Sequence, residues 1–399
     1  MKTASIDFYD PGRFVDSVPL EDFRWLRENE PVYFNPQENG PGFWNLTKYD
    51  DVVSASRNWE TFSSARGTNI DDPAGGVELM MVNMDPPKHT KLRMLVRTGF
   101  TPRRVGNIEP HVREIATKII DGVAGKGECD FVTDIAAELP LQVITEMIGV
   151  PDEDRHKIFH WSNQMIGLDD PEYGNSIDVA TAAAFEMYEY WDGLGKERRG
   201  ERREDLVTAL VEAEIDSQGL SDLEIDVFLL LLAVAGNETT RNLISHGMHS
   251  LAQNPEEKER LLAQPDLLPL TVEEMLRTAT PVMHFRRTAT KDTEVRGVPI
   301  KEGQKVLLWY ISGNRDEEVF PQPDRFDVGR TPNEHLGFGG GGPHFCLGAN
   351  LARLEIRVMF EELLRRLPDI ELAGPVPRLR SNFINGLKHM PVRFTPERA

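Results

Sequence analysis

The spacing of apolar and polar positions predicts a small β-containing region near the start of the chain. Leu20–Arg27 has helical spacing and precedes two strand-like runs, Val32–Phe34 and Gly42–Asn45. A turn rich in Asn, Gly and Pro separates the two runs, which predicts a β-hairpin. The stretch from Ser63 to Val77 is rich in Gly, Asp and Asn and has no periodicity, so we expect a loop there.

Helical spacing dominates the middle of the chain. From Pro102 to about Pro281, apolar residues recur three and four positions apart between Pro and Gly interruptions. The longest predicted helix starts at a capping box formed by Ser221 and Glu224 and continues to about Gln253. After Arg287 the pattern changes to short alternating and β-branched runs, which predict small sheets. The whole pattern indicates a mainly α protein with small peripheral β-sheets.

Composition and charge narrow the class of protein. The chain has 399 residues, of which 40% are hydrophobic and 28% charged, and a net charge of −20. This content is enough for one large core, and the acidic balance argues against a nucleic-acid partner. No apolar run has the length of a signal peptide or of a membrane span, which takes about 18 residues. We therefore expect a soluble, cytoplasmic monomer without a membrane anchor.

A glycine-rich loop brings one of the two cysteines to the start of a predicted helix. From His335 to Gly348 the chain reads His-Leu-Gly-Phe-Gly-Gly-Gly-Gly-Pro-His-Phe-Cys-Leu-Gly. Helix N-terminal N–H groups favour a thiolate at Cys346, and the glycines let the backbone pass close to a flat ligand. A haem-thiolate site needs both features, because a cysteinate ligand favours O–O cleavage. An isolated cysteine can also be an inert, buried small hydrophobe, and the loop alone leaves both interpretations open.

The spacing within this loop resembles the cytochrome P450 family. His344, Cys346 and Gly348 keep the offsets of the family's loop Phe-Gly-x-Gly-x-His-x-Cys-x-Gly, while Phe338 lies one residue farther from the cysteine. This longer variant is similar to bacterial members that act on steroids, methyl-branched lipids or terpenoids. The resemblance implies a single-domain cytochrome P450 fold that binds haem b, with Cys346 as axial thiolate to the iron and with Phe338 and Gly348 beside the cofactor.

The same resemblance suggests how the chain divides along its length. We expect one domain over residues 1–399, with an N-terminal β-containing lobe at about 30–60. Further β structure is expected at about 288–310 and 376–396, and the helical body at about 85–286 and 346–367.

Polar residues interrupt the longest predicted helix in its middle. After an apolar run the chain reads Ala235-Gly-Asn-Glu238-Thr239-Thr, and buried polar residues need partners. Thr239 can donate to the carbonyl of Ala235 one turn earlier, and Gly236 weakens the helix, so together they would open a groove. A polar kink that satisfies itself locally is the alternative. By resemblance, Glu238 and Thr239 are the acid and the alcohol that guide protons during oxygen cleavage.

Two further groups of residues are expected to support the cofactor. Glu274 and Arg277 can pair on one helix face, and the resemblance adds Arg325 to form a structural triad. His89 and Arg93 lie four positions apart on a predicted helix and can reach one carboxylate edge together. By resemblance they hold the haem propionates together with His344 and one arginine of a neighbouring pair, and we prefer Arg287 to Arg286 because Arg287 directly precedes a strand start. Solvated surface cations are the alternative for each.

A basic run distinguishes one segment of this acidic chain. Between Lys88 and Arg104 there are six Lys or Arg residues and no acidic residue. Such a run is often a solvated surface. Next to the propionate residues, however, it can guide an acidic electron carrier, so we expect a ferredoxin with an NAD(P)H-dependent ferredoxin reductase as partners.

Taken together, these motifs predict a monooxygenase that inserts one atom of dioxygen into a hydrophobic small molecule of the steroid, branched-lipid or terpenoid class. A haem-thiolate sensor or carrier without turnover and a peroxide-driven haem enzyme are the alternatives. Substrate contacts are expected from the loop at 70–82, from 231–235, from 282–285 and from 383–387. The residues selected from these segments are Met81, Leu231, Val234, Ala235, Val282, Met283 and Ile384.

Overall fold

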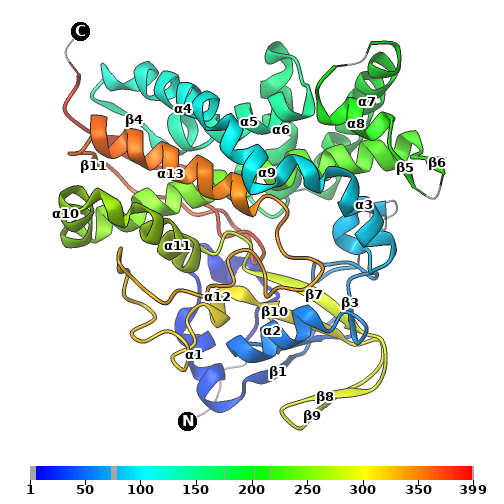
Figure 1. The fold of residues 1–399 in the computed structure, drawn as a ribbon. Helices are drawn as coiled ribbons and strands as arrows, with labels where there is room; N and C mark the ends of the chain where they lie inside the picture. The colour runs from blue at the N-terminus through cyan, green and yellow to red at the C-terminus, as the bar shows by residue number, and fades with distance from the viewer. Residues whose placement is uncertain (1–5, 73–78, 175, 202, 216, 398–399) are drawn as a thin grey trace.

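The structure, a computed structural model, describes residues 6–72, 79–174, 176–201, 203–215 and 217–397. Figure 1 shows most of the helices grouped in one half of the molecule, with the largest sheet beside the N-terminus in the other half. The predicted fold class, mainly α with small β-sheets, is confirmed.

The longest helix, α9 (Asp222–Gln253), crosses the middle of the molecule (Figure 1). Its start is the predicted capping box, in which the Ser221 side chain accepts from the Glu224 N–H and the Glu224 carboxylate accepts from the Ser221 N–H. Pro255 lies just beyond its end and cannot continue the helix. The helix runs unbroken, so the predicted opening at Gly236 is not a break in α9.

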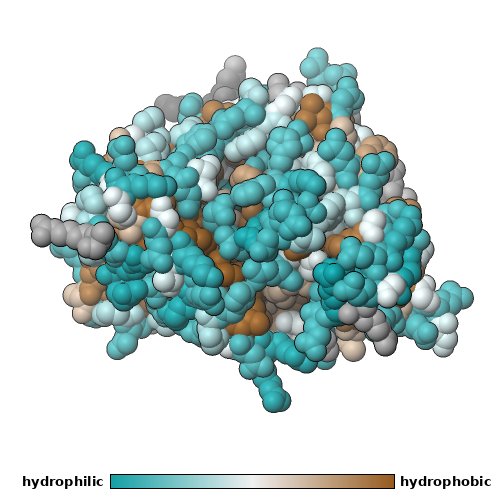
Figure 2. Space-filling view, turned by 90° about the horizontal axis from the view of Figure 1, so that it is seen from above, coloured by the Kyte–Doolittle hydropathy of each residue, from teal (hydrophilic) through white to brown (hydrophobic). Residues whose placement is uncertain are grey.

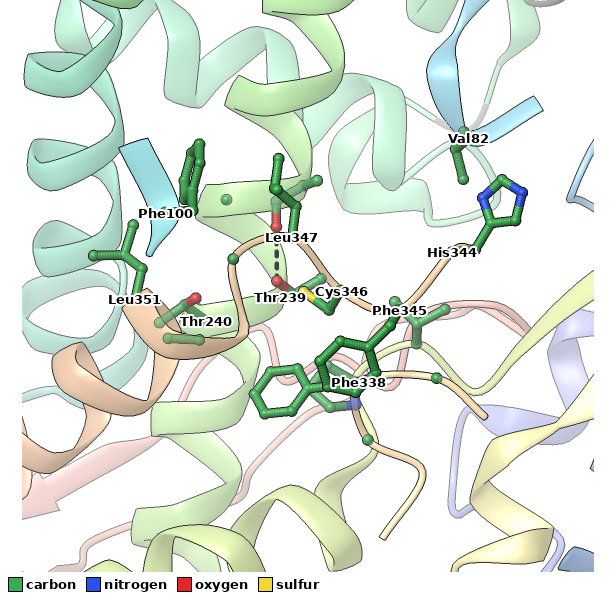
Figure 3. Close-up of a pocket in the computed structure, with 18 of the residues that line it drawn as sticks. Val82, Phe100, Thr239, Thr240, Phe338, His344, Phe345, Cys346, Leu347 and Leu351 are labelled. Atoms are coloured by element: carbon green, nitrogen blue, oxygen red, sulfur yellow. Dashed lines mark hydrogen bonds between the residues drawn. The ribbon is translucent and has the colours of Figure 1, made fainter. Parts of the chain in front are cut away.

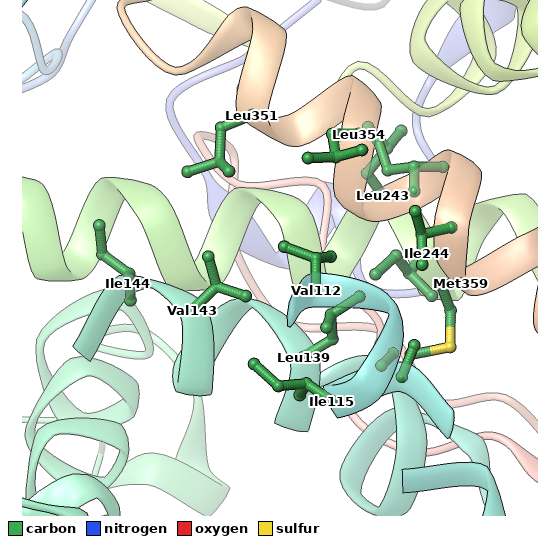
Figure 4. Close-up of a cluster of buried hydrophobic side chains, with 14 of the residues drawn as sticks. Val112, Ile115, Leu139, Val143, Ile144, Leu243, Ile244, Leu351, Leu354 and Met359 are labelled. Atoms are coloured by element: carbon green, nitrogen blue, oxygen red, sulfur yellow. The ribbon is translucent and has the colours of Figure 1, made fainter. Parts of the chain in front are cut away.

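The core of the helical half is built around α9 by four other helices. These are α4 (Pro102–Ala124), α5 (Glu138–Ile148), α7 (Ile177–Gly200) and α13 (Ala349–Arg366). Figure 4 shows where α4, α5, α9 and α13 meet, with Val112, Val143, Leu243 and Leu354 directed toward one another. Burial of each such side chain contributes about 1.5–3 kcal/mol. This packing fixes α13, and with it the segment that precedes α13, against α9.

A five-stranded sheet forms the largest part of the β structure. The predicted hairpin is confirmed as β1 (Val32–Asn35) and β2 (Phe43–Leu46), which pair antiparallel. Strand β10 (Lys305–Trp309) pairs parallel with β2 and antiparallel with β7 (His284–Ala289), and β3 (Phe62–Ser63) closes the order β1-β2-β10-β7-β3. Because side chains alternate along a strand, Phe285 and Arg287 share one face of β7 and His284 and Arg286 share the other.

The remaining elements are short or flank the core. Strand β7 starts slightly before the range expected for C-terminal β structure, and β4 lies within the range expected to be helical. The other helical segments are η1 (Pro11–Phe14), α1 (Leu20–Asn29), α2 (Tyr49–Arg57), η3 (Met81–Asn83), α3 (Lys88–Val96), η4 (Arg97–Phe100), η5 (Val132–Ala136), η6 (Asp152–Asp154), α6 (Arg155–Ile166), η7 (Pro171–Tyr173), α8 (Leu206–Val211), α10 (Pro255–Ala263), η8 (Pro265–Leu267), α11 (Leu268–Ala279) and α12 (Tyr310–Gly313). The other strands are β4 (Glu128–Asp130), β5 (Glu214–Ile215), β6 (Gln218–Gly219), β8 (Thr293–Val295), β9 (Val298–Ile300), β11 (Glu371–Leu372) and β12 (Pro391–Arg393).

The surface is mostly hydrophilic on the face that Figure 2 shows, where hydrophobic side chains gather in patches between charged ones. Two large apolar side chains on α7, Ile177 and Phe185, are exposed by 62% and 64%. None of the helices in the described part of the chain combines the length and the apolar character that a membrane-spanning segment needs.

Candidate active site

A mostly apolar cavity lies between α9 and the loop that carries Cys346 (Figure 3). One wall is the face of α9 that contains Ala235 and Thr239. The opposite wall is the cysteine loop, which we define as residues 335–348, together with the first turns of α13. The other residues that line the cavity include Met81, Val82, His89, Arg93, Phe100, Ile144, Leu231, Leu232, Thr240, Leu243, Leu276, Pro281, Val282, Phe285 and Tyr310.

The cysteine loop owes its shape to its glycines. Gly339, Gly341 and Gly342 have φ values of +94°, +86° and +74°, a region that favours glycine. A Cβ on Gly342 would lie 2.6 Å from the carbonyl oxygen of Ser56, so the loop also passes too close to α2 for a larger residue. At the far end, a Cβ on Gly348 would meet nothing within 4 Å, which leaves open space beside Cys346.

The extra residue in the loop does not separate Phe338 from the cysteine. The N–H of Cys346 donates to the carbonyl oxygen of Phe338 at 3.0 Å, and the Phe338 side chain lines the cavity. In Figure 3 the Phe338 ring lies next to Cys346. The additional glycine is therefore absorbed within the turn between the two residues.

Cys346 lies two residues before the N-cap of α13, as the sequence predicts. Burial raises the pKa of its thiol, while the N–H of Gly348 and the charges of Arg93 and Arg353 act in the opposite direction. Burial has the larger effect, so the helix N-terminus alone does not keep this sulfur ionised. A bound metal ion would do so, because a thiol that coordinates a metal loses its proton.

Four basic side chains come together at one edge of the cavity, as the sequence predicts for His89, Arg93, Arg287 and His344. The rings of His89 and His344 have their centroids 4.3 Å apart, and both residues line the cavity with Arg93. Burial and then Arg93 lower the pKa of His89 to about 4. Burial, Arg287, His89 and Arg93 lower the pKa of His344 to about 2. Both imidazoles are therefore uncharged near neutral pH in the protein alone, because burial and the neighbouring arginines disfavour a further positive charge there.

The structure distinguishes the two neighbouring arginines of β7. Arg286 forms an ion pair with Asp72 at 2.7 Å and donates to backbone carbonyls of residues 69–71. Arg287 is only 2% exposed and lies close enough to His89 and His344 to lower the pKa of both. This placement supports the preference for Arg287.

The cavity fits the haem that the sequence implies. Nδ1 of the buried His89 has no hydrogen-bond partner within the described residues. Asp85 is a nearby carboxylate that favours the protonated forms of His89 and Arg287. It already accepts hydrogen bonds from Ser63 Oγ and from the N–H of Ser64. Two propionates would supply the missing acceptors and negative charge, and Cys346 lies in the same cavity as the donor for iron.

The two residues expected to guide protons, Glu238 and Thr239, lie on different faces of α9. Thr239 lines the cavity and donates to the carbonyl oxygen of Ala235 at 2.7 Å, as predicted. Glu238 is fully buried on another face of α9, where it forms an ion pair with Arg241. Burial raises the pKa of Glu238, and Arg241 partly offsets this. Arg241, which also donates to Asn163 at 2.6 Å, was not predicted, although its spacing of three from Glu238 was a signal.

The prediction that Arg325 completes the cluster of Glu274 and Arg277 is wrong. Glu274 accepts from Arg277 Nε at 2.8 Å, as expected, but the third member is Arg330, whose Nε lies 3.0 Å from both carboxylate oxygens. The side chain of Arg325 is 56% exposed and pairs with Glu257 instead. Arg325 contributes only its carbonyl oxygen, which accepts from both Arg277 and Arg330.

Four of the expected substrate contacts, Met81, Leu231, Ala235 and Val282, line the cavity. The other three expected contacts, Val234, Met283 and Ile384, are not among the described residues that line the cavity. Val234 lies off the α9 stripe that faces the cavity. Met283 lies just before β7, where its N–H donates to the carbonyl of Phe383 and its own carbonyl accepts from the N–H of Ile311. Met283 is buried instead in a second hydrophobic cluster with Phe8 and Trp309, and Ile384 forms a β-bridge with Val282. Residues 73–78 of the loop expected to contact substrate lie outside the described residues.

The sequence and the fold match known haem proteins. The profile of the family described as Cytochrome P450 matches residues 180–369. A steroid C26-monooxygenase of Rhodococcus jostii is 45% identical over 97% of this chain and 84% of its own. A methyl-branched lipid omega-hydroxylase of Mycobacterium tuberculosis is 43% identical over 99% of this chain and 95% of its own. A solved structure of a Mycobacterium marinum cytochrome P450 in complex with pseudoionone has a TM-score of 0.93 at 40% identity, covering 99% of each chain.

Proposed function

Because this chain belongs to the cytochrome P450 family of haem-binding monooxygenases, which act on hydrophobic substrates, we propose that it hydroxylates the methyl-branched end of a long apolar molecule. The two relatives are named for a steroid oxidised at C26 and for a methyl-branched lipid hydroxylated at its omega position.

The observation that carries this proposal is the composition of the cavity between Cys346 and α9. Apart from the basic edge and the α9 hydroxyls, its walls are mostly apolar side chains, among them Met81, Leu231, Val282 and Phe285. Such walls bind an alkyl chain through burial and give a polar headgroup no partners. The bound haem supplies the chemistry of dioxygen cleavage, and the protein supplies binding and orientation.

The chain's own residues take distinct roles in this proposal. Cys346 would ligate the iron, and His89, Arg93, Arg287 and His344 would bind the propionates, with Phe338 and Gly348 beside the cofactor. The hydroxyl of Thr239 is held by the carbonyl of Ala235 at the cavity wall, where it can hold and pass a proton. Glu238 supplies protons from the buried side of α9 when its pairing with Arg241 loosens.

We also propose that an acidic ferredoxin, reduced by an NAD(P)H-dependent reductase, delivers electrons beside the cysteine loop. Members of the family need a redox partner. Arg97, Arg103 and Arg104 are exposed on η4 and α4. The basic segment 88–104 adjoins the cysteine loop and the start of α13. Arg93 donates to the carbonyl of Phe345 in the loop at 2.6 Å, and Asn350 of α13 donates to the carbonyl of Phe100 at 3.2 Å. A positive surface at this place favours encounter with an acidic carrier.

The test compares substrates that differ only at the chain end. The haem-loaded protein is incubated with ferredoxin, reductase, NADPH and ¹⁸O₂, and with either a methyl-branched fatty acid, a steroid with a branched side chain, or a straight-chain fatty acid of equal carbon number. We expect one ¹⁸O atom in a terminal hydroxyl of the branched substrates and less product from the straight chain. Hydroxylation at a ring or mid-chain carbon would contradict the proposed orientation. Product formed only with peroxide would support the peroxide-driven alternative, and a spectral response without product would support a sensor or carrier.

A further inference from the structure

We infer that Glu273 and Arg353 are positioning residues that hold the cysteine loop in place through the ring of Phe338. The inference rests on the proposed role of Cys346 as the iron ligand. Glu273 directly precedes Glu274 on α11, but the two carboxylates have different partners. Glu274 binds Arg277 and Arg330, whereas Glu273 binds residues on both sides of Cys346 in the sequence.

The Glu273 carboxylate connects three elements of the fold. Arg353, in the second turn of α13, donates from Nε at 2.6 Å to one oxygen and from Nη2 at 2.7 Å to the other, which is a bidentate pair. His335, at the start of the cysteine loop, lies with Nε2 3.0 Å from the second oxygen. One carboxylate on α11 therefore fixes both the segment that enters the loop and the helix that leaves it.

The hydrogen bonds at His335 fix the orientation of its ring. Its Nδ1 accepts the N–H of Gly337 at 3.0 Å, which directs Nε2 toward Glu273. The side chain of His335 is only 3% exposed. Burial raises the pKa of Glu273, but the bonds from Arg353 and His335 together outweigh burial and bring this pKa to about 2. Glu273 is consequently ionised near neutral pH.

Arg353 transmits this anchor to the cysteine. Its guanidinium lies over the face of the Phe338 ring, 4.5 Å from the centroid, which is a cation–π arrangement. The backbone carbonyl of the same Phe338 accepts the N–H of Cys346 at 3.0 Å. The Phe338 ring also meets Phe345, the residue before the cysteine, at 6.3 Å between centroids. A shift of Arg353 would therefore free the ring and the backbone that sets the direction of the sulfur.

The next turn of α13 provides a matched control. Arg357 has a side-chain exposure of 29%, close to the 36% of Arg353, and forms ion pairs with Glu109 and Glu361. Its partners lie on α4 and α13, and among the described residues its guanidinium forms no hydrogen bond or ion pair with the cysteine loop. Loss of Arg357 should lower stability as a surface ion pair does without changing the cysteine.

The experiment measures retention of the thiolate ligand in the haem-loaded protein. Wild type, Glu273→Gln, Arg353→Ala and Arg357→Ala are reduced under carbon monoxide, and the loss of the thiolate-type Soret band is followed in mild urea. We expect Glu273→Gln and Arg353→Ala to lose the band about 10- to 100-fold faster than wild type, the usual effect of removing a group that orients a metal ligand. Arg357→Ala should stay close to wild type.

The same substitutions are also made in a protein that carries Phe338→Leu, which tests whether the contact with the Phe338 ring transmits their effect. If Arg353 acts through the ring, its effect on the rate nearly vanishes when Phe338 is leucine, whereas Glu273→Gln keeps only the part of its effect that passes through His335. Effects that stay fully additive in that background, or unfolding midpoints that fall while the rate of band loss stays unchanged, would overturn the inference. A wild-type protein that lacks the thiolate band altogether would instead contradict the proposed iron ligand, so the two failures are distinguishable.

Discussion

Because Arg330, and not Arg325, pairs with Glu274 in the buried cluster, the structure predicts different losses of stability for two variants. Arg330→Ala removes two bonds to the Glu274 carboxylate and three to the carbonyls of Pro321, Gln322 and Arg325. Removing one partner of a buried ion pair costs about 3–5 kcal/mol. Glu274 keeps Arg277 and the amide of Asn333, so we expect the lower end, about 3 kcal/mol. Arg325→Ala removes an exposed pair worth at most about 1 kcal/mol.

Thermal unfolding of the haem-loaded protein, followed by far-UV circular dichroism, measures this difference. With about 2.1 cal/mol/K of unfolding entropy per residue, a chain of this length has about 0.8 kcal/mol/K, so 3 kcal/mol corresponds to a fall of about 4 °C in Tm. Arg325→Ala should shift Tm by roughly 1 °C or less. Equal destabilisation by the two substitutions, or a larger effect of Arg325→Ala, would refute the assignment of Arg330 to the cluster.

Three further predictions concern protons and electron transfer. Thr239→Ala removes one hydrogen-bonding group at the cavity wall, so product per NADPH consumed should fall roughly tenfold with an unchanged substrate-induced spectral shift; coupling equal to wild type would contradict the role of Thr239. The ring nitrogens of His389 lie 2.6 Å from Asp130 and 2.8 Å from Glu172. Burial lowers the pKa of His389, but the two carboxylates outweigh burial and raise this pKa overall. The stability that His389 contributes is therefore complete below its unfolded pKa of about 6.5 and is lost as the pH rises through the folded pKa. The difference in unfolding free energy between wild type and His389→Gln should therefore shrink from pH 6 to pH 9, and a difference independent of pH would argue against an imidazolium. Arg97→Glu should raise the KM for an acidic ferredoxin and weaken the dependence of this KM on salt concentration. Lys291→Glu, on the exposed turn after β7, should change neither, and equal effects of the two substitutions would exclude a defined docking face.

Local signals in the sequence were sufficient for much of the fold and for the centre of the site. The capping box at Ser221 and the bond from Thr239 to Ala235 each involve residues within one helical turn, so neither depends on distant packing. The position of Cys346 before α13 follows from a continuous motif for the same reason. The basic group at His89 and Arg93 was likewise visible as a helical spacing of four.

The errors arose where the direction of a side chain depends on distant parts of the chain. Arg325 and Arg330 lie in the same irregular segment, and only its folding against α11 decides which guanidinium is buried. Phe285 lies in β7, where pairing with β10 sets the face of each side chain, whereas Met283 precedes β7 and its backbone bonds to Phe383 and Ile311. Glu273 was adjacent to a residue of interest, but its partners lie 62 and 80 positions away in the sequence and leave no local pattern.

The central claim, that Cys346 ligates haem iron in a monooxygenase, is tested most directly by the absorption spectrum of the reduced protein under carbon monoxide, recorded beside a Cys346→Ala variant. The account predicts a red-shifted Soret band typical of a thiolate-ligated haem in the wild type and its loss in the variant. An imidazole-type band in the wild type, or a thiolate-type band that survives the substitution, would contradict it.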